Sequence, residues 1–253
     1  MSTNPFTMSQ EGGLYSPHGA SFSFAVVVFV KNEAMIIGSL IDQVAERVDR
    51  NNIFVVDGHS TDDTAAIVRD KKAHYLLDTG KGKGAAIRFA ITEISRDVLV
   101  FMDSDGSHQP QEIVSLLKPF EEEKDVAMVV GSRFMGGSEE LSHSPQEIMR
   151  RVGNMLSTFI VNARWHVHLT ETQNGFRAVR RSAALVWVLC ENTFAIEQEL
   201  TMQCLKRKRK IIEVPSFELK RAHGVSHVVP HKMLPVYMGC FLRNVFSRDE
   251  NVL

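Results

Sequence analysis

Two carboxylates stand one residue apart at the point where an apolar run of the sequence ends. The run spans 98–102, and Asp103 and Asp105 follow it. A strand that is apolar throughout fits a parallel α/β sheet, because helices then cover both of its faces. Side chains at positions i and i+2 of an extended segment point the same way, so both acids can contact one ligand at the strand's carboxyl end. This spacing favours a hard divalent cation with phosphate oxygens, although Asp, Ser and Gly also form ordinary turns.

A glycine-rich loop, Gly80-Lys-Gly-Lys-Gly84, precedes a predicted helix. Glycine lets backbone amides approach a phosphate closely, and the positive end of the helix dipole adds to the attraction. The loop lacks the ending of a P-loop, but Gly80, Gly82 and Ala85 match the dinucleotide fingerprint G-x-G-x-x-A. That fingerprint belongs to the first βα unit of its domain, whereas this loop follows the third predicted strand. An NAD(P)-dependent oxidoreductase is therefore an alternative.

Two further polar residues come directly after predicted strands. Asp57 can accept hydrogen bonds from a base or a ribose, or it can cap a helix or close a turn. Arg133 presents a guanidinium suited to phosphate or to a sugar hydroxyl, although a single arginine is also common on any surface. We expect both residues at the same edge of the sheet as Asp103.

The elements that must position these groups follow the pattern of an α/β fold. Five apolar runs predict strands and helical patterns separate them, which predicts a doubly wound, mostly parallel sheet. The predicted strands are 24–30, 53–56, 74–77, 97–103 and 126–130, and the helices between them end at about 48, 71, 94 and 122.

The pattern is less regular after residue 133, where we predict a loop, three helices, two short strands and a last apolar and basic helix. They span 136–145, then 147–163, 182–189 and 196–206, then 211–214 and 217–220, and finally 232–246. The predicted organisation is a flexible tail (1–22), a single domain (23–228) and a C-terminal helix or tail (229–253). Within the domain, 23–133 carries the residues expected to bind phosphate or a nucleotide, and 134–228 forms a smaller second part.

Composition narrows the class of protein. The 253 residues are 44% hydrophobic and 23% charged with a net charge of −1, typical of a globular enzyme and without the basic excess of a nucleic-acid-binding protein. Three distant cysteines form no C-x-x-C pair, which disfavours a disulfide framework and a zinc site. His223, His227 and His231 are evenly spaced, but glycine and proline between them disfavour a metal triad on one helical face.

Localisation is predicted from the absence of certain segments. No run reaches the roughly 18 apolar residues of a membrane span, and 1–21 lacks a signal pattern, so we expect a cytoplasmic protein. The basic run Lys206–Lys210 is expected to be a solvated surface. Together with Lys232–Phe246 it could contact a membrane, which would place the protein peripherally at the cytoplasmic membrane face.

In this order, the motifs resemble family 2 glycosyltransferases of GT-A fold, within them the dolichyl-phosphate mannose and polyprenyl-phosphate glucose synthases. The resemblance covers about 24–226, through 26–33, 55–64, 82–88, 102–110, 130–134, 171–178, 194–200, 213–216 and 221–226. It implies a Rossmann-like nucleotide-sugar fold, a nucleoside diphosphate sugar donor such as a UDP- or GDP-hexose, Mg²⁺ or Mn²⁺ on the Asp-x-Asp pair, and inversion at the anomeric carbon. The implied acceptor is a polyprenyl or dolichyl phosphate.

The resemblance also implies roles for individual residues. The nucleoside would lie against Asn32, Glu33 and Asp57, with Lys83 near the nucleotide. Asp103 and Asp105 would contact the ribose and the metal. Arg133 and Arg221 would face phosphate, and the segment from Gln173 to Arg177 would line the sugar and acceptor side.

Three positions depart from the family's usual pattern. Lys31 and Gly58 replace its tyrosine and its second aspartate, and Glu171 stands where aspartate is more common. These departures keep a third hypothesis open, a non-catalytic module that binds sugar nucleotides. A homodimer also remains an open hypothesis.

The sequence leaves the acceptor open. An acceptor phosphate is already ionised and needs no general base. A hydroxyl on a glycan or a small molecule needs one, for which Glu171, Glu197 and Glu199 are the candidates.

Overall fold

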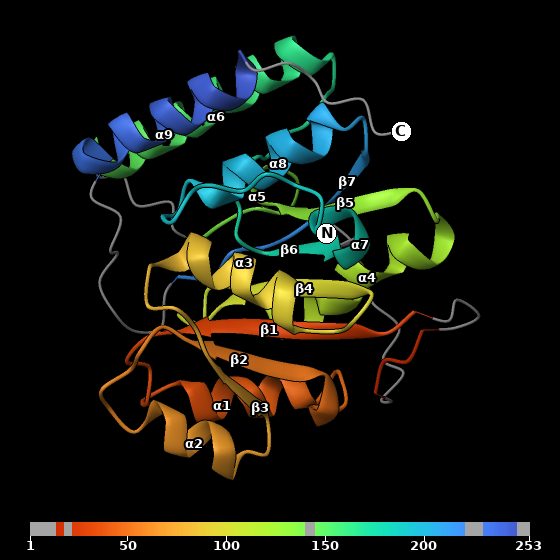
Figure 1. Cartoon of the computed structure of the whole chain (residues 1–253), viewed down its shortest axis with the longest axis vertical. Helices are drawn as coiled ribbons and strands as arrows, with labels where there is room; N and C mark the ends of the chain where they lie inside the picture. Colours follow the sequence, from red (N-terminus) through yellow and green to blue (C-terminus); the bar gives the residue numbers. More distant parts are fainter. Residues whose placement is uncertain (1–13, 18–21, 140–144, 221–229, 247–253) are drawn as a thin grey trace, which may run out of the picture.

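The computed structural model describes residues 14–17, 22–139, 145–220 and 230–246 (Figure 1). Arg221, His223, His227 and 140–144 of the predicted loop therefore lie outside the described residues, whereas His231 is part of a described helix. In the part of the chain that is described, seven strands form one sheet in the order β3-β2-β1-β4-β6-β5-β7. The strands are β1 (Phe24–Val30), β2 (Ile53–Asp57), β3 (His74–Leu77), β4 (Val98–Asp103), β5 (Val126–Ser132), β6 (Arg177–Arg180) and β7 (Lys210–Pro215).

Helices cover both faces of this sheet. They are α1 (Ile37–Ala45), α2 (Thr64–Asp70), α3 (Lys83–Glu93), α4 (Ile113–Glu122), α5 (Arg133–Gly136), α6 (Pro145–Trp165), α7 (Arg181–Ala184), α8 (Ile196–Lys206) and α9 (Pro230–Val245), with short 3-10 turns at Arg50–Asn52 and Pro110–Glu112. The apolar faces of α1 and α4 pack on one side of the sheet, and those of α3 and α8 pack on the other. The strands β1 and β5 are buried along their whole length, which explains their unbroken apolar sequences.

The pairing of β1 with its neighbours defines the edge where the site lies. Both β2 and β4 run parallel to β1, with Val30 opposite Asp57 and Phe29 opposite Asp103. The two aspartates therefore flank the end of β1 at the carboxyl edge of the sheet, as the sequence predicted.

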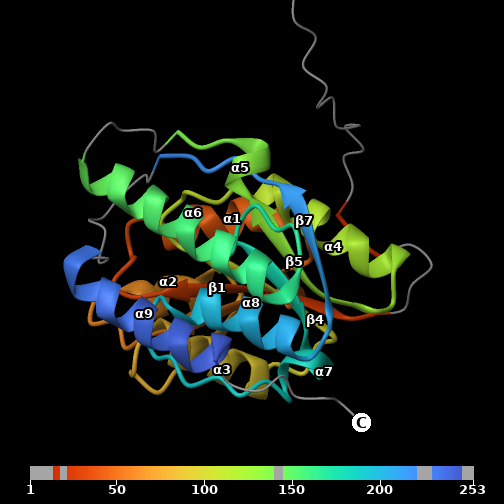
Figure 2. The ribbon, with the colours of Figure 1, turned by 90° about the horizontal axis from the view of Figure 1, so that it is seen from above.

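The last layer is formed by α6 and α9, which lie side by side over α8 in both views (Figures 1 and 2). Val161 of α6 and Phe241 of α9 share a small core with Met202 of α8. Among the helices that the structure describes, none has both the length and the apolar character needed to cross a bilayer.

Two predictions about secondary structure were wrong. The segment 217–220 forms only a single bridge between Glu218 and Ser138, because its backbone N–H groups bind loop groups such as the Glu112 carboxylate. The helix predicted over 182–189 is only α7, since the chain turns so that Trp187 can enter the core. The mostly parallel sheet is confirmed: among the described strands only β6 is antiparallel, and it enters the sheet from the site edge.

The basic run Lys206–Lys210 is not one solvated surface. Lys206 and Arg207 are buried, and Arg207 donates to the side chain of Gln203, so only 208–210 of the run are exposed.

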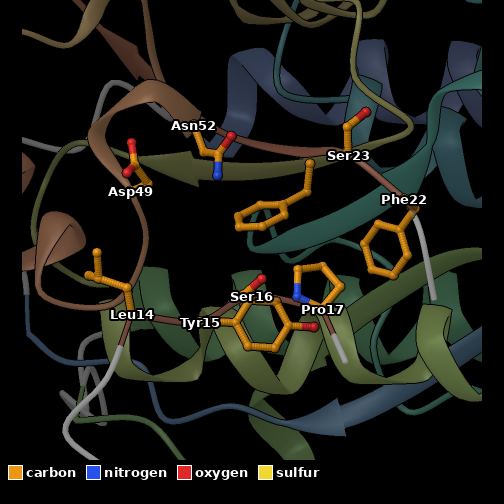
Figure 3. Close-up of a pocket in the computed structure, with 9 residues that line it drawn as sticks. Leu14, Tyr15, Ser16, Pro17, Phe22, Ser23, Asp49 and Asn52 are labelled. Atoms are coloured by element: carbon orange, nitrogen blue, oxygen red, sulfur yellow. The ribbon is translucent and has the colours of Figure 1, made fainter. Parts of the chain in front are cut away.

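Residues 14–17, within the predicted tail, lie against the domain. The Tyr15 hydroxyl donates to Glu121 at 2.5 Å, and the ring contacts Phe24 edge to face. A hollow of about 360 Å³ opens between this segment and the loop that carries Asp49 and Asn52 (Figure 3). The hollow lies at the amino end of β1, whereas Asp103 lies at the opposite, carboxyl edge of the sheet.

Candidate active site

The centre of the site is an ammonium group between two carboxylates. Lys83 is the first residue of α3, and its Nζ lies 2.7 Å from Oδ1 of Asp103 and 2.6 Å from Oε1 of Glu197. The side chains of Lys83 and Glu197 are only 11% and 7% exposed, whereas that of Asp103 is 31% exposed. Burial favours a neutral lysine, but the two carboxylates outweigh it and raise the pKa of Lys83. The lysine is therefore charged, and Asp103 is the acid that remains accessible.

Asp105 closes a turn directly after β4. Its Oδ1 accepts from the backbone N–H of Ser107 at 3.0 Å and from the Ser107 hydroxyl at 2.6 Å, and Gly106 has φ +79°. The backbone N–H of Asp103 donates to Nδ1 of His108, whose ring stacks on Phe176. A turn therefore follows β4, and it orients the Asp105 carboxylate.

A glycine lies directly over this cluster. A Cβ added to Gly175 would lie 3.0 Å from Asp103 Oδ2 and from Lys83 Nζ, and 3.1 Å from Glu197 Oε1. The loop before β6 therefore forms a wall of the site, and any side chain at this position would displace the charged groups.

A second buried ion pair lies at the end of β5. The Nε of Arg133 donates to Glu171 at 2.8 Å, and its Nη1 lies 3.4 Å from both oxygens of Glu218. Glu171 is fully buried and also accepts from the side chain of Asn154 on α6 and from the backbone of Gln173. Burial alone would raise the pKa of Glu171, but Arg133 and these donors hold it below its usual value. The carboxylate is therefore a poor proton acceptor.

The residues predicted to contact the nucleoside lie in the loops after β1 and β2. Asp57 accepts from the backbone and hydroxyl of Ser60 and from the Tyr75 hydroxyl at 2.8 Å. Burial and then this hydrogen bond raise the pKa of Tyr75 to about 12. Asn32 has φ +56°, and its side-chain oxygen accepts from the backbone N–H of Thr61. The two loops are thus joined, and the backbone of Glu33 adds a bond to Thr64.

Two predicted site residues lie elsewhere. Arg177 is fully buried and donates to the carbonyls of Asn174 and Glu197, so it supports the loop over the site instead of reaching a ligand. Burial lowers its pKa to about 10. Glu199 points away from Lys83 and accepts from the backbone of Cys190 and Glu191.

The glycine-rich loop is used differently from a phosphate cradle. The N–H of Gly80 donates to Asp78, and the N–H of Gly84 donates to the carbonyl of Asn192 at 3.0 Å. A Cβ at Gly82 would lie 2.5 Å from that same carbonyl oxygen. Close approach of another backbone segment therefore explains these glycines, and the dinucleotide alternative loses its main support.

The chemistry of the Asp103 and Asp105 pair fits a hard divalent cation. Both groups are carboxylates in turn geometry at one strand end, which is the oxygen donor set that Mg²⁺ and Mn²⁺ prefer. Lys83 already balances part of the charge of Asp103. Glu218 and Asn154 belong to the same site, but no spacing in the sequence connects them with it.

Comparison with known proteins identifies the class of this chain. The family described as glycosyl transferase family 2 matches residues 25–186, so the chain belongs to that family and is a glycosyltransferase. This agrees with the resemblance drawn from the motifs and excludes the oxidoreductase as its class.

Curated relatives share about three quarters of the chain. Glycosyltransferase AglJ of Haloferax volcanii is 30% identical over 76% of this chain, which spans 62% of that protein. The dolichyl-phosphate hexose transferase of the same organism is 30% identical over 76% of this chain and 80% of its own length. Polyprenol monophosphomannose synthase of Mycolicibacterium smegmatis is 27% identical, with 79% of each chain covered.

Solved structures agree on the fold. Glucosyl-3-phosphoglycerate synthase of Mycobacterium tuberculosis superposes with a TM-score of 0.69 at 21% identity, over 91% of this chain and 83% of that one. The same enzyme has been solved with Mn²⁺, UDP-glucose and phosphoglyceric acid, again with a TM-score of 0.69 and 21% identity, over 91% and 82% of the two chains. The chain therefore has the GT-A fold.

Proposed function

We propose that this chain transfers a hexose, with inversion, from a nucleoside diphosphate sugar to a polyprenyl phosphate. The observation that carries the proposal is the register of β1 with β2 and β4. It brings Asp57 and Asp103 to one edge of the sheet, where Arg133 directly follows β5. The printed functions of the dolichyl-phosphate and polyprenol relatives support this choice of acceptor.

For the donor, the nucleoside would bind at the joined loops that carry Asn32, Glu33 and Asp57. The diphosphate would lie towards Asp103 and Asp105, which would hold Mg²⁺ or Mn²⁺. When bound, such an ion stabilises the negative charge that forms on the leaving diphosphate. Lys83 keeps a positive charge beside Asp103 in a mostly buried position, where electrostatic stabilisation is strong.

The states of the predicted bases favour a phosphate acceptor. Glu197 is paired with Lys83, Glu171 is paired with Arg133, and Glu199 faces another loop. A hydroxyl acceptor needs a carboxylate that can take up a proton, whereas an ionised phosphate needs none. Arg133 is the cation suited to orient that phosphate. Transfer to a hydroxyl on a glycan is the second candidate, and Glu197 would be its base after separation from Lys83.

An acceptor with a lipid chain requires contact with a membrane, and the structure offers an apolar face for it. We call the outward surface of α6 and α9 the outer apolar face. Its members are Ile148, Val152, Met155, Leu156 and Phe159, which are 52–69% exposed, and Met238, Leu242 and Phe246, which are 48–78% exposed.

The outer apolar face has the features of a helix that lies on an anionic bilayer. Its α6 residues recur at helical spacing, and the helix sequence contains three arginines and one glutamate. On the opposite side of α6, Asn154 contacts Glu171 of the site. We infer that the face meets anionic lipid and that a lipid phosphate reaches Arg133 from there. A homodimer through the same face is the competing arrangement.

A transfer assay tests this function. The full chain is incubated with UDP- and GDP-hexoses, Mn²⁺ or Mg²⁺, and either undecaprenyl phosphate in detergent or a free glycan, and products are identified by mass spectrometry. We expect a polyprenyl phosphate hexose, loss of product with EDTA, and loss in Asp105→Asn. Asp63→Asn, an exposed acid before α2, is the matched control and is expected to stay active. Metal-independent transfer, or transfer to glycan alone, would contradict the proposal.

A further inference from the structure

The position of Lys83 depends on a loop that lies outside the matched family region. This loop, 190–192, follows the last matched residue, 186. Its Asn192 carbonyl accepts from the N–H of Gly84 in the first turn of α3, and a Cβ at Gly84 would lie 2.1 Å from the carbonyl oxygen of Glu191. One turn further along, Arg88 donates to the Glu191 carbonyl and to the Asn192 side chain. The loop therefore packs against the first turn of α3, from which the Lys83 side chain projects, and forms hydrogen bonds with this helix.

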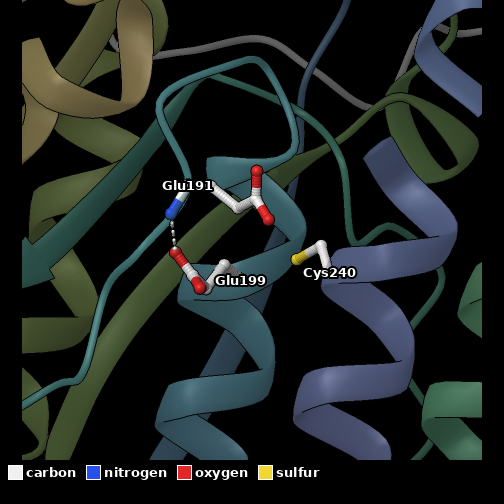
Figure 4. A group of neighbouring side chains, drawn as sticks. All are labelled: Glu191, Glu199 and Cys240. Carbon is white, nitrogen blue, oxygen red and sulfur yellow. Dashed lines mark hydrogen bonds between the residues drawn. The ribbon is translucent and has the colours of Figure 1, made fainter. Parts of the chain in front are cut away.

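A buried carboxylate holds this loop. Oε2 of Glu199 accepts from the backbone N–H groups of both Cys190 and Glu191, each at 2.9 Å, and Glu199 is 1% exposed (Figure 4). Residues two apart on a helix point about 200° apart, so Glu197 faces Lys83 while Glu199 faces the loop. Helix α8 thus contacts Lys83 directly through Glu197, and through Glu199 it holds the loop that packs against the first turn of α3.

The neighbouring groups are accounted for by protein contacts. Glu191, Glu199 and the Cys240 thiol lie within 4.8 Å of one another, but the Glu191 carboxylate pairs with Arg243 of α9 and the thiol donates to the Ala195 carbonyl. We assign no metal to this group.

We propose that Glu199 is a positioning residue for Lys83, acting through the loop 190–192. This inference rests on the proposed function, because it assumes that Lys83 and Asp103 serve the donor site. Both hydrogen bonds end on one oxygen of a buried carboxyl group, and their loss would leave the buried N–H of Glu191 and the partly buried N–H of Cys190 unpaired. The loop would then shift, the first turn of α3 would follow it, and Lys83 would leave its place between Asp103 and Glu197.

The chemical reactivity of Lys83 tests this without any substrate. The intact protein is labelled with acetic anhydride, and the labelling rates of Lys83 and of exposed Lys81 are compared by peptide mass spectrometry. In the wild type Lys83 should react far more slowly. Glu199→Ala is expected to raise the Lys83/Lys81 ratio about tenfold, the factor that corresponds to the loss of one buried hydrogen bond. Glu199→Gln retains an oxygen acceptor and should stay near the wild-type ratio.

A second variant removes the contact between α3 and the loop 190–192 from the α3 side. Arg88→Ala removes the guanidinium from the loop, leaves Glu199 intact, and should also raise the ratio. Glu93→Ala, an exposed acid at the end of the same helix, is the control and should leave it unchanged. If Glu199→Ala does not fold, Arg88→Ala decides alone. A wild-type ratio in the folded variants, or the same rise in Glu93→Ala, would overturn the proposal.

Turnover supplies a second readout. Once transfer has been measured, kcat of Glu199→Ala should fall about tenfold with the glutamine variant near wild type, because a small misplacement of a catalytic group is costly. If no transfer is found, the proposed function fails while the labelling ratio still tests the link between Glu199 and Lys83.

Discussion

Nζ of Lys83 lies 2.7 Å from Oδ1 of Asp103, the first carboxylate of the Asp-x-Asp pair. The same ammonium group binds Glu197, so Asp103 belongs to a cluster of three charged residues. Lys83 orients Asp103 and offsets part of its charge, and Asp105 is oriented separately by its turn. The two acids of the pair therefore have unequal surroundings and should respond differently to substitution.

Replacing Lys83 tests its contribution. Lys83→Met keeps a long apolar chain and removes the charge between Asp103 and Glu197. We expect kcat to fall by about 10²–10³, the range found when a single stabilising donor is removed from a site that develops negative charge. The measurement is steady-state transfer at saturating donor and metal. Lys81→Met, two residues earlier and exposed, should retain wild-type turnover, and an unchanged kcat in Lys83→Met would show that the ammonium does not act on the reaction.

The pH dependence of stability reports on Glu199. Its burial raises the pKa to about 7 from the usual 4.5. Between these values the unfolded chain has lost the proton that the folded chain keeps, so this group lowers the free energy of unfolding as pH rises from about 4.5 to 7. Its contribution is at most about 3 kcal/mol. The effect is complete above pH 7 and absent well below pH 4.5.

The variant Glu199→Gln lacks this titration. Its free energy of unfolding minus that of the wild type should therefore increase between about pH 5 and 7 and then stay level, as measured by urea unfolding at a series of pH values. Glu93→Gln, an exposed acid, is the control and should give a flat difference. A flat difference for Glu199→Gln as well would mean that Glu199 is ionised across this range.

The strands of the sheet and the residues at their carboxyl ends could be predicted from the sequence, because local hydrophobic pattern determines them. Continuous apolar runs defined the parallel strands, and their last residues placed Asp57 and Asp103 at one edge, which the register confirms. The same reasoning placed Arg133 at this edge, and it follows β5 directly. These inferences needed only the periodicity of strands and the direction of parallel chains.

Other features depend on contacts between distant segments, and local patterns do not encode these. The antiparallel entry of β6 buries Arg177, which the motif had suggested as a ligand contact. Glu197 and Glu199 looked equivalent as acids, but helix geometry turns them to opposite sides. Gly84 suggested a phosphate loop, whereas it accommodates the backbone of Glu191.

The outer apolar face should bind anionic membranes. Leu156→Ser and Phe159→Ser replace two of its exposed residues, 59% and 69% accessible, without touching the inward contact of Asn154. Burying one large apolar side chain is worth about 1.5–3 kcal/mol, so each variant should weaken partitioning by at least about tenfold. Flotation with vesicles of phosphatidylcholine and phosphatidylglycerol measures the bound fraction, and vesicles of phosphatidylcholine alone should bind less protein.

A matched variant separates this surface from general hydrophobicity. Leu77→Ser replaces a side chain of similar exposure, 49%, at the end of β3, and its partitioning should equal that of the wild type. Self-association is measured in parallel by light scattering. If the wild type is a dimer that ignores vesicles, and Leu156→Ser and Phe159→Ser make it a monomer, the face is a contact between two copies of the chain. Binding that requires anionic lipid and fails only in the two α6 variants would instead place α6 and α9 on the bilayer, with the acceptor phosphate approaching Arg133 from that side.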